Sequence, residues 1–131
     1  MTRHDGQTLQ VTVLAPVPLM TANQRGNWAV KARATRAWRT AARVAGERVK
    51  ADRFREGDHV HITATIHRSH NRGRYDALNY APTVKAIVDG IVDAGLIADD
   101  SNRYVTGPDL RPGEPREVAQ VVLVLTPVDA P

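Results

Sequence analysis

Residues 28–50 contain no proline and carry apolar side chains at the spacing of an α-helix over more than six turns. One side of such a helix collects Val30, Ala34, Trp38, Ala41, Ala45 and Val49. The opposite side collects Arg36, Arg39, Arg43 and Lys50. We therefore expect a long amphipathic helix that packs on a core with one side and presents a cationic stripe on the other. Such a stripe suits a phosphate backbone or an ordinary solvated surface.

Two further segments alternate apolar and polar residues with the period of two that predicts half-buried strands. The apolar positions are Leu9, Val11, Val13 and Ala15 in residues 8–15, and Val60, Ile62, Ala64 and Ile66 in residues 58–68. The apolar run in residues 117–126 suits a central strand, and residues 103–107 predict a short fourth strand. We expect the proline-rich residues 108–117 between them to form a turn.

A second helix is predicted over residues 82–94. Pro82 suits its first turn, Asn79 is a candidate capping residue, and Gly95 ends the pattern. Its buried side would carry Val84, Ile87, Val88 and Ile91. We therefore expect residues 1–131 to form a single α+β domain, in which a mixed, mainly antiparallel sheet of about four strands is packed by two main helices.

The composition of the chain limits the classes of function that it can have. The chain has no cysteine, which excludes disulfides and thiolate zinc sites and favours a reducing, cytoplasmic setting. We expect neither a signal peptide nor a membrane span. Residues 1–57 carry 11 Lys and Arg against 4 Asp and Glu, a net of +7, whereas residues 58–131 carry 7 against 10, a net of −3. A basic half attracts a polyanion and clustered carboxylates attract a divalent cation, so nucleic acid with a metal satisfies both halves.

Three histidines, His59, His61 and His67, share the polar side of the strand predicted at residues 58–68. We interpret them as the polar face of that strand, because no further ligand with transition-metal spacing follows them. His67 lies nearest the next loop, which brings it closest to the candidate site described next.

An acidic group surrounds the second helix: Asp76 before it, Asp89 within it and Asp99 and Asp100 after it, with Lys85 one turn before Asp89. Phosphodiester hydrolysis needs an activated water and charge neutralisation, which divalent metals held by a few carboxylates provide. Asp76 and Asp99 can meet only if the chain beyond Gly95 folds back toward the start of the helix. Taken alone, the same residues fit turns, caps and an ordinary Lys85–Asp89 ion pair equally well.

The stretch RGRYDALNYAPTVKAIVDGIVDAGLIADDSNRYV, residues 72–106, resembles the RusA family of phage and prophage Holliday junction resolvases. In that family an arginine-rich loop leads to an Asp-x-Asp-Asn element, followed by a lysine, a helix aspartate, a glycine and an Asp-Asp pair. The segment APVPLMTANQRGNW is similar to the amino-terminal region of the family, so the resemblance covers about residues 9–126.

The resemblance implies a Mg²⁺-dependent endodeoxyribonuclease, with Mn²⁺ as a substitute and no small-molecule cofactor. Asp76, Asp99 and Asp100 would bind the metal, Asp89 would support them, and Lys85 would orient the scissile phosphate. The implied partners are branched DNA, above all a four-way junction, and a second copy of the chain in a homodimer. The implied DNA contacts are Arg36, Arg39, Arg43, Arg68, Arg72, Arg74, Asn79 and Lys85.

One position departs from the family. Leu78 stands where the second aspartate of the Asp-x-Asp-Asn element is expected, and leucine cannot bind magnesium. Either Asp89, Asn79 or Asp100 completes the site, or cleavage is weak, or the protein binds junctions without cutting them. The resulting rivals are an inactive branched-DNA-binding protein and a nuclease for flaps or RNA.

Overall fold

The computed structural model describes residues 8–49 and 58–128, which form an α+β fold. Its elements in chain order are β1 (Leu9–Leu14), α1 (Trp28–Val49), β2 (His59–His67), the short 3₁₀ helix η1 (Ala77–Tyr80), α2 (Ala81–Asp93), β3 (Val105–Pro112) and β4 (Gln120–Val128). The predicted fold class is therefore confirmed, including both main helices and all four strands. Lys50, predicted as the last cation of the α1 stripe, lies outside the described residues.

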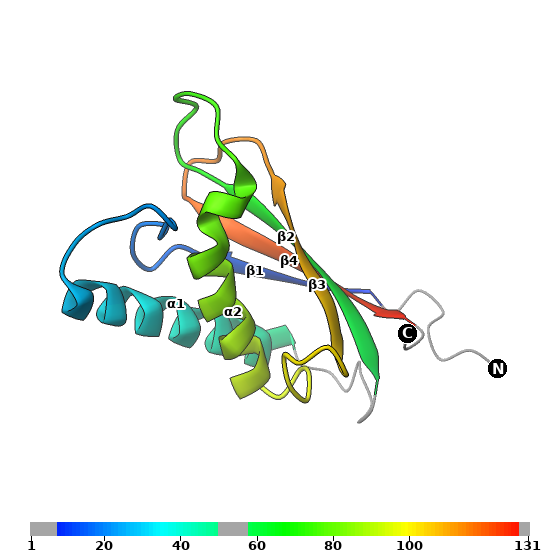
Figure 1. The fold of residues 1–131 in the computed structure, drawn as a ribbon. Coiled ribbons are helices and arrows are strands. Elements are labelled where there is room, and N and C mark those ends of the chain that lie inside the picture. The colour runs from blue at the N-terminus through cyan, green and yellow to red at the C-terminus, as the bar shows by residue number, and fades with distance from the viewer. Residues whose placement is uncertain (1–7, 50–57, 129–131) are drawn as a thin grey trace.

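The four strands form one sheet in the order β1-β4-β2-β3. The strand β4 is antiparallel to both β1 and β2, whereas β3 runs parallel to β2. The apolar run of β4 therefore lies in the centre of the sheet, as its sequence predicts. Both helices pack on one side of the sheet (Figure 1).

The core lies between the helices and the sheet. Its largest fully buried side chains are Trp38, Ile62, Ile66, Ile87, Ile91, Leu123 and Leu125. The helices α1 and α2 cross where Gly90 of α2 meets the backbone of α1, since a Cβ on Gly90 would clash with the carbonyl oxygen of Arg39 and with Cβ of Ala42. This close crossing fixes the position of α2, and α2 carries two of the candidate catalytic residues, Lys85 and Asp89.

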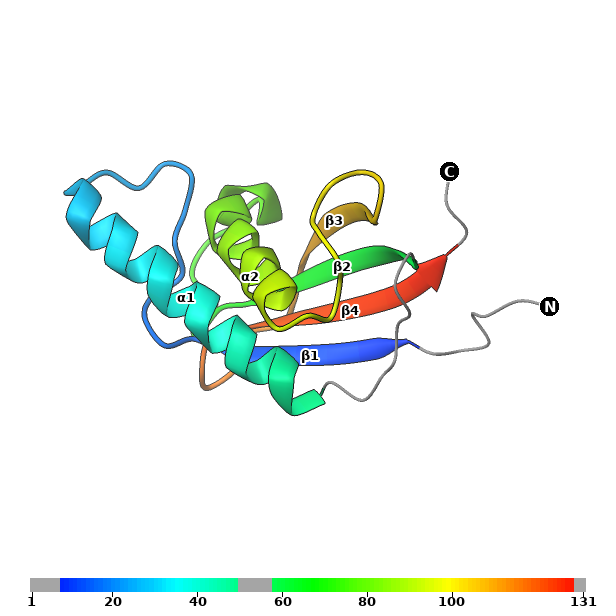
Figure 2. The same ribbon diagram turned by 90° about the horizontal axis from the view of Figure 1, so that it is seen from below.

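Three local predictions are wrong. Val30 is 51% exposed because the first turns of α1 project beyond the sheet, as the two views show (Figures 1 and 2). Asn79 does not cap α2, because it lies inside η1 and Tyr80 occupies the capping position. The strand predicted at residues 103–107 is β3, which extends to Pro112. Residues 108–112 therefore belong to a strand and not to the predicted turn.

Neither helix among the described residues combines the length and the apolar character needed to cross a membrane.

Candidate functional site

Lys85 joins two carboxylates that are far apart in sequence. Its Nζ donates to Oδ1 of Asp89 at 2.9 Å and to Oδ2 of Asp100 at 2.5 Å. Asp99 stands beside this group, because its Oδ1 accepts the backbone N–H of Asp100 at 2.8 Å. The structure therefore brings four of the five predicted catalytic residues into one polar cluster, which we call the Lys85 cluster (Lys85, Asp89, Asp99 and Asp100).

The return of the chain after α2 builds this cluster. Gly95 adopts a φ of +79°, which a residue with a side chain rarely adopts, and its N–H donates to the carbonyl of Val92. Leu96 and Ile97 then bury their side chains in the core and hold the chain against α2. Asp100 consequently reaches Lys85, the fifth residue of α2, so the chain beyond Gly95 folds back along the helix, as a meeting of Asp76 and Asp99 would require.

The hydrogen bond between Lys85 and Asp100 keeps both side chains charged. The hydrogen bond to Asp100, followed by that to Asp89, raises the pKa of Lys85 above its ordinary value. The hydrogen bond from Lys85 holds the pKa of Asp100 below its ordinary value. Near neutral pH Asp100 is therefore ionised and Lys85 protonated, so Lys85 acts as a cation rather than as a general base.

Asp76 lies at the start of η1 and has a structural role there. Its Oδ1 accepts the backbone N–H of Leu78 at 3.0 Å, which caps the short helix. Within residues 8–49 and 58–128, Asp76 forms no hydrogen bond or ion pair with a member of the Lys85 cluster, and no group of three or more His, Asp or Glu side chains is placed to hold a metal ion. Asp76 is thus the one predicted catalytic residue that the structure leaves outside the cluster.

A hollow of about 390 Å³ adjoins the cluster between α2 and the edge strand β3. Lys85 and Asp100 form its charged part, and the rest is apolar: Leu78, Ala81, Val84, Val88, Val105, Pro108 and Leu110. Leu78 is 65% exposed although it is apolar. The position that departs from the family pattern therefore lines the same hollow as the two charged residues.

The arginine-rich loop, residues 68–74, divides its cations between an anchored and an exposed set. Arg68 is buried: its guanidinium stacks 3.8 Å above the centre of the Tyr75 ring and donates to the carbonyl of Gly73. Arg72 and Arg74 are exposed and form no ion pair with a described residue. Arg72 and Arg74 thus suit phosphate contacts at the surface, whereas Arg68 first of all holds the loop in place.

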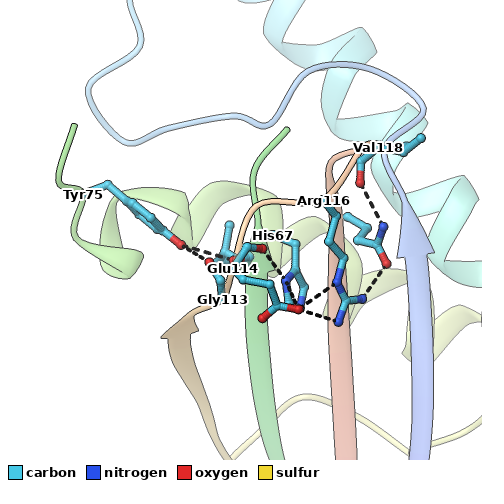
Figure 3. Close-up of polar contacts among 8 residues, drawn as sticks. His67, Tyr75, Gly113, Glu114, Arg116 and Val118 are labelled. Carbon is cyan, nitrogen blue, oxygen red and sulfur yellow. Dashed lines mark hydrogen bonds and ion pairs between the residues drawn. The ribbon is translucent and has the colours of Figure 1, made fainter. Parts of the chain in front are cut away.

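A second loop, residues 113–119, packs against the end of β2 beside this arginine loop (Figure 3). The hydroxyl of Tyr75 donates to the carbonyls of Ile66 and Gly113, and the Nδ1 of His67 lies 2.8 Å from the carbonyl oxygen of Glu114. A carbonyl only accepts, so this nitrogen of His67 carries a proton. His67 is thus a buried structural residue, and it contacts Glu114 of the 113–119 loop rather than a member of the Lys85 cluster.

The other two histidines of β2 also have structural partners. His59 is buried between the carbonyl of Arg103 and the hydroxyl of Thr106, and His61 pairs with Asp109 at 2.6 Å. All of these partners belong to β3 or to the turn before it. The histidines therefore fasten the edge strand to β2.

The cationic stripe of α1 is partly neutralised. Arg39 forms a two-pronged ion pair with Asp93 of α2 at 2.6 and 2.9 Å, and Arg43 pairs with Glu47 on its own helix. The hydrogen bond from Arg39 lowers the pKa of Asp93. Arg36 has no ion pair with a described residue, which leaves it the best placed of the three predicted DNA contacts on α1.

Sequence reasoning missed two functional features. Asp93 shares a helix side with Lys85 and Asp89, yet nothing local indicates that it meets Arg39 across the helix crossing. Tyr75 was overlooked as the platform of Arg68, although an aromatic residue next to an arginine-rich loop is a usable signal for a cation–π contact.

Asn79, predicted as a DNA contact, accepts the backbone N–H of Ala22 with its carbonyl and so connects η1 to the loop before α1.

No protein-family model matches this sequence, and no curated protein matches it. The resemblance to the RusA family therefore rests on the residues quoted above.

Proposed function

We propose that the protein is a Mg²⁺-dependent endodeoxyribonuclease that nicks branched DNA, with four-way junctions as its principal substrate. The observation that carries this proposal is the Lys85 cluster, in which a helix lysine contacts a helix aspartate and one member of a following Asp-Asp pair. These are the residue types and the order that the RusA resemblance implies, gathered in space from sequence positions 15 residues apart.

The donor chemistry of the acidic residues fits Mg²⁺. This ion prefers carboxylate oxygens, usually takes one or two of them from the protein, and completes its shell with waters and substrate phosphate. Asp99 and Asp100 would hold it, with Asp76 as a further ligand and Asp89 in support. When bound, the ion would neutralise phosphate charge and lower the pKa of a coordinated water.

The chain's own cations have separate roles in this proposal. The raised pKa of Lys85 keeps its amine protonated, so it would orient the scissile phosphate and stabilise the charge that develops on it. Arg72, Arg74 and Arg36 would contact the DNA backbone and set the position of the junction without reading bases. A symmetric homodimer would place two such sites for paired nicks, each leaving a 5′-phosphate end, in the cytoplasm of the cell or phage host.

A nicking assay on synthetic four-way junctions with Mg²⁺ tests the proposal. Asp100→Asn and Asp99→Asn should abolish cleavage while they preserve junction binding. Asp76→Asn keeps a side-chain oxygen that can cap η1. If this variant lost activity, the loss would therefore indicate that Asp76 takes part in cleavage, and not that the fold is damaged. Asp93→Asn is the matched control, because Asp93 lies one turn beyond Asp89 and pairs with Arg39 instead of Lys85.

A second candidate is a branched-DNA-binding protein without cleavage activity, favoured by the exposed Leu78 in place of an expected aspartate. Junction binding without nicking, unchanged by Asp76→Asn, would support it against the nuclease. Preferential cleavage of flaps or RNA in a substrate panel would replace the junction as the principal substrate and keep the nuclease chemistry.

A further inference from the structure

Trp28, the first residue of α1, is 79% exposed, whereas the only other tryptophan in the chain, Trp38, is fully buried. The local backbone fixes the position of Trp28. Oδ1 of Asn27 accepts the N–H of Ala29 at 2.7 Å, and the carbonyl of Asn27 accepts the N–H groups of Val30 and Lys31. A large aromatic side chain is thus held at the surface on an ordered helix end rather than on a free loop.

The surroundings of Trp28 are cationic. Residues 8–46 contain no Asp or Glu, and Arg25, Lys31, Arg33 and Arg36 form no ion pair with any described residue. The pairs with carboxylates begin only further along the helix, at Arg39 and Arg43. The start of α1 therefore combines an exposed aromatic ring with positive charge that the protein itself does not neutralise.

Two hollows with one lining residue in common lie at this helix end and at the arginine-rich loop. One, of about 230 Å³, is lined among others by Thr21, Val30 and Lys31. The other, of about 300 Å³, is lined among others by Thr21, Arg68 and His70. Thr21 lines both hollows, and we call the two together the strand path, with Lys31 beside one of them and Arg68 beside the other.

We propose that Trp28 and this path bind an unpaired nucleic-acid strand, with one base stacked on the indole ring and the phosphates of the strand running toward the arginine-rich loop. Stacking on an aromatic side chain beside cations is the usual means by which proteins hold single strands without reading their sequence. An apolar protein partner would leave the cations without a role, whereas a nucleic acid uses both. The inference rests on the proposed function in taking nucleic acid as the ligand, and it adds recognition of unpaired bases at the branch point.

Intrinsic fluorescence of the full chain tests this, with oligothymidylate as the probe. Stacking should quench the emission of Trp28 and leave that of buried Trp38 unchanged. Trp28→Ala should remove the quenching and weaken oligothymidylate binding by roughly 5- to 150-fold, the loss expected for one stacked base. Trp28→Tyr should retain most of the affinity. Leu14→Ala, which truncates another exposed apolar residue, should bind as the wild type does.

Trp28→Ala changes only a surface side chain, and the emission of Trp38 reports whether the variant is folded. Wild-type affinity in folded Trp28→Ala, or unchanged emission of the wild type at saturating oligothymidylate, would overturn the inference. So would binding to anionic lipid vesicles but not to the oligonucleotide.

The two proposals fail separately. If oligothymidylate quenched Trp28 but no junction, flap or RNA were cleaved, the nuclease proposal would be wrong. Strand binding at Trp28 would still be supported. The opposite result would be junction nicking that requires Asp100, together with the same nicking rate and oligothymidylate affinity in Trp28→Ala as in the wild type. It would support the nuclease and contradict strand binding at Trp28.

Discussion

Nζ of Lys85 lies 2.5 Å from Oδ2 of Asp100, although 15 residues separate them in sequence. The same amine lies 2.9 Å from Oδ1 of Asp89, so one positive charge stands between two carboxylates. A divalent cation entering the Lys85 cluster would meet this charge first. If the cluster binds a divalent cation as proposed, the ammonium would compete with this cation in the free protein and would become available to phosphate once it leaves the carboxylates.

Lys85→Met should therefore increase the affinity for Mn²⁺ or Mg²⁺ in the absence of DNA. A unit charge about 4 Å away is worth about 1 kcal/mol even in bulk water, so we expect a gain of about 5-fold or more. Junction nicking should fall at the same time, because the cation that orients the phosphate is lost. Calorimetric titration of the metal measures the first effect. Arg39→Met removes a comparable ion pair from Asp93 and should leave metal affinity unchanged; equal or weaker binding in Lys85→Met would contradict the competition.

His70 should make strand binding depend on pH. Partial removal from water, followed by the charges of Arg68 and Arg72, lowers the pKa of His70 below its ordinary value of 6.5, so its ring is neutral at pH 7. A phosphate in the hollow that His70 shares with Arg68 would offset those charges and raise the pKa. Binding would then take up a proton, and affinity should rise as the pH falls below 7, by at most about tenfold per pH unit.

The measurement is the affinity for oligothymidylate between pH 5 and 8 at constant ionic strength, about the range in which histidine titrates. His70→Gln should flatten the part of the curve that belongs to this residue. An identical pH profile in wild type and His70→Gln would show that no phosphate approaches the ring.

Long periodic segments made most of the fold predictable. The alternation in β1 and β2 and the helical spacing in α1 and α2 extend over enough residues to identify each element and most of its buried side, with Val30, His59 and His67 as exceptions. The end of β3 was missed because Gly107 and the prolines of this segment favour a turn locally. At the edge of a sheet, however, proline costs fewer hydrogen bonds, and β3 pairs with β2 alone.

The candidate site was predictable only where its contacts are local or nearly so. The spacing of four residues indicated the Lys85–Asp89 pair, whereas the contact between Lys85 and Asp100 was not predicted, because it depends on how the chain returns after Gly95. The ion pair between Arg39 and Asp93 depends on where α1 and α2 cross, which is set by tertiary packing around Gly90. No pattern along either helix encodes that crossing.

Gly90→Ala tests how tightly this crossing is packed. In an exposed helix such a change is stabilising by up to about 1 kcal/mol. Here the added methyl group would overlap the carbonyl of Arg39 and Cβ of Ala42, so we expect destabilisation by about 1–3 kcal/mol. Urea unfolding measures the difference. Thr40→Ala, at an exposed position of α1, should stay within about 0.5 kcal/mol of the wild type; a stabilised Gly90→Ala would mean that the helices have room to separate.

Thr83 of α2 should hold in place the loop around Met20, which lines the proposed strand path. Its fully buried hydroxyl accepts the N–H of Met20 at 2.7 Å and donates to the carbonyl of the same residue at 2.8 Å. Thr83→Val keeps the shape but leaves both backbone groups without this partner. Each of the two unsatisfied buried groups costs roughly 1–3 kcal/mol, so we expect a loss of about 2–6 kcal/mol in the free energy of unfolding.

Thr83→Ser is the matched control, because it keeps the hydroxyl and loses one methyl group, a change worth about 1 kcal/mol. Amide hydrogen exchange at Met20 should accelerate in Thr83→Val and remain slow in Thr83→Ser. Oligothymidylate affinity should follow the same order, since Met20 and Thr21 line the hollow beside Lys31. If the valine variant were as stable as the serine variant, the hydroxyl would not be what holds this loop against α2, and the strand path would need another support.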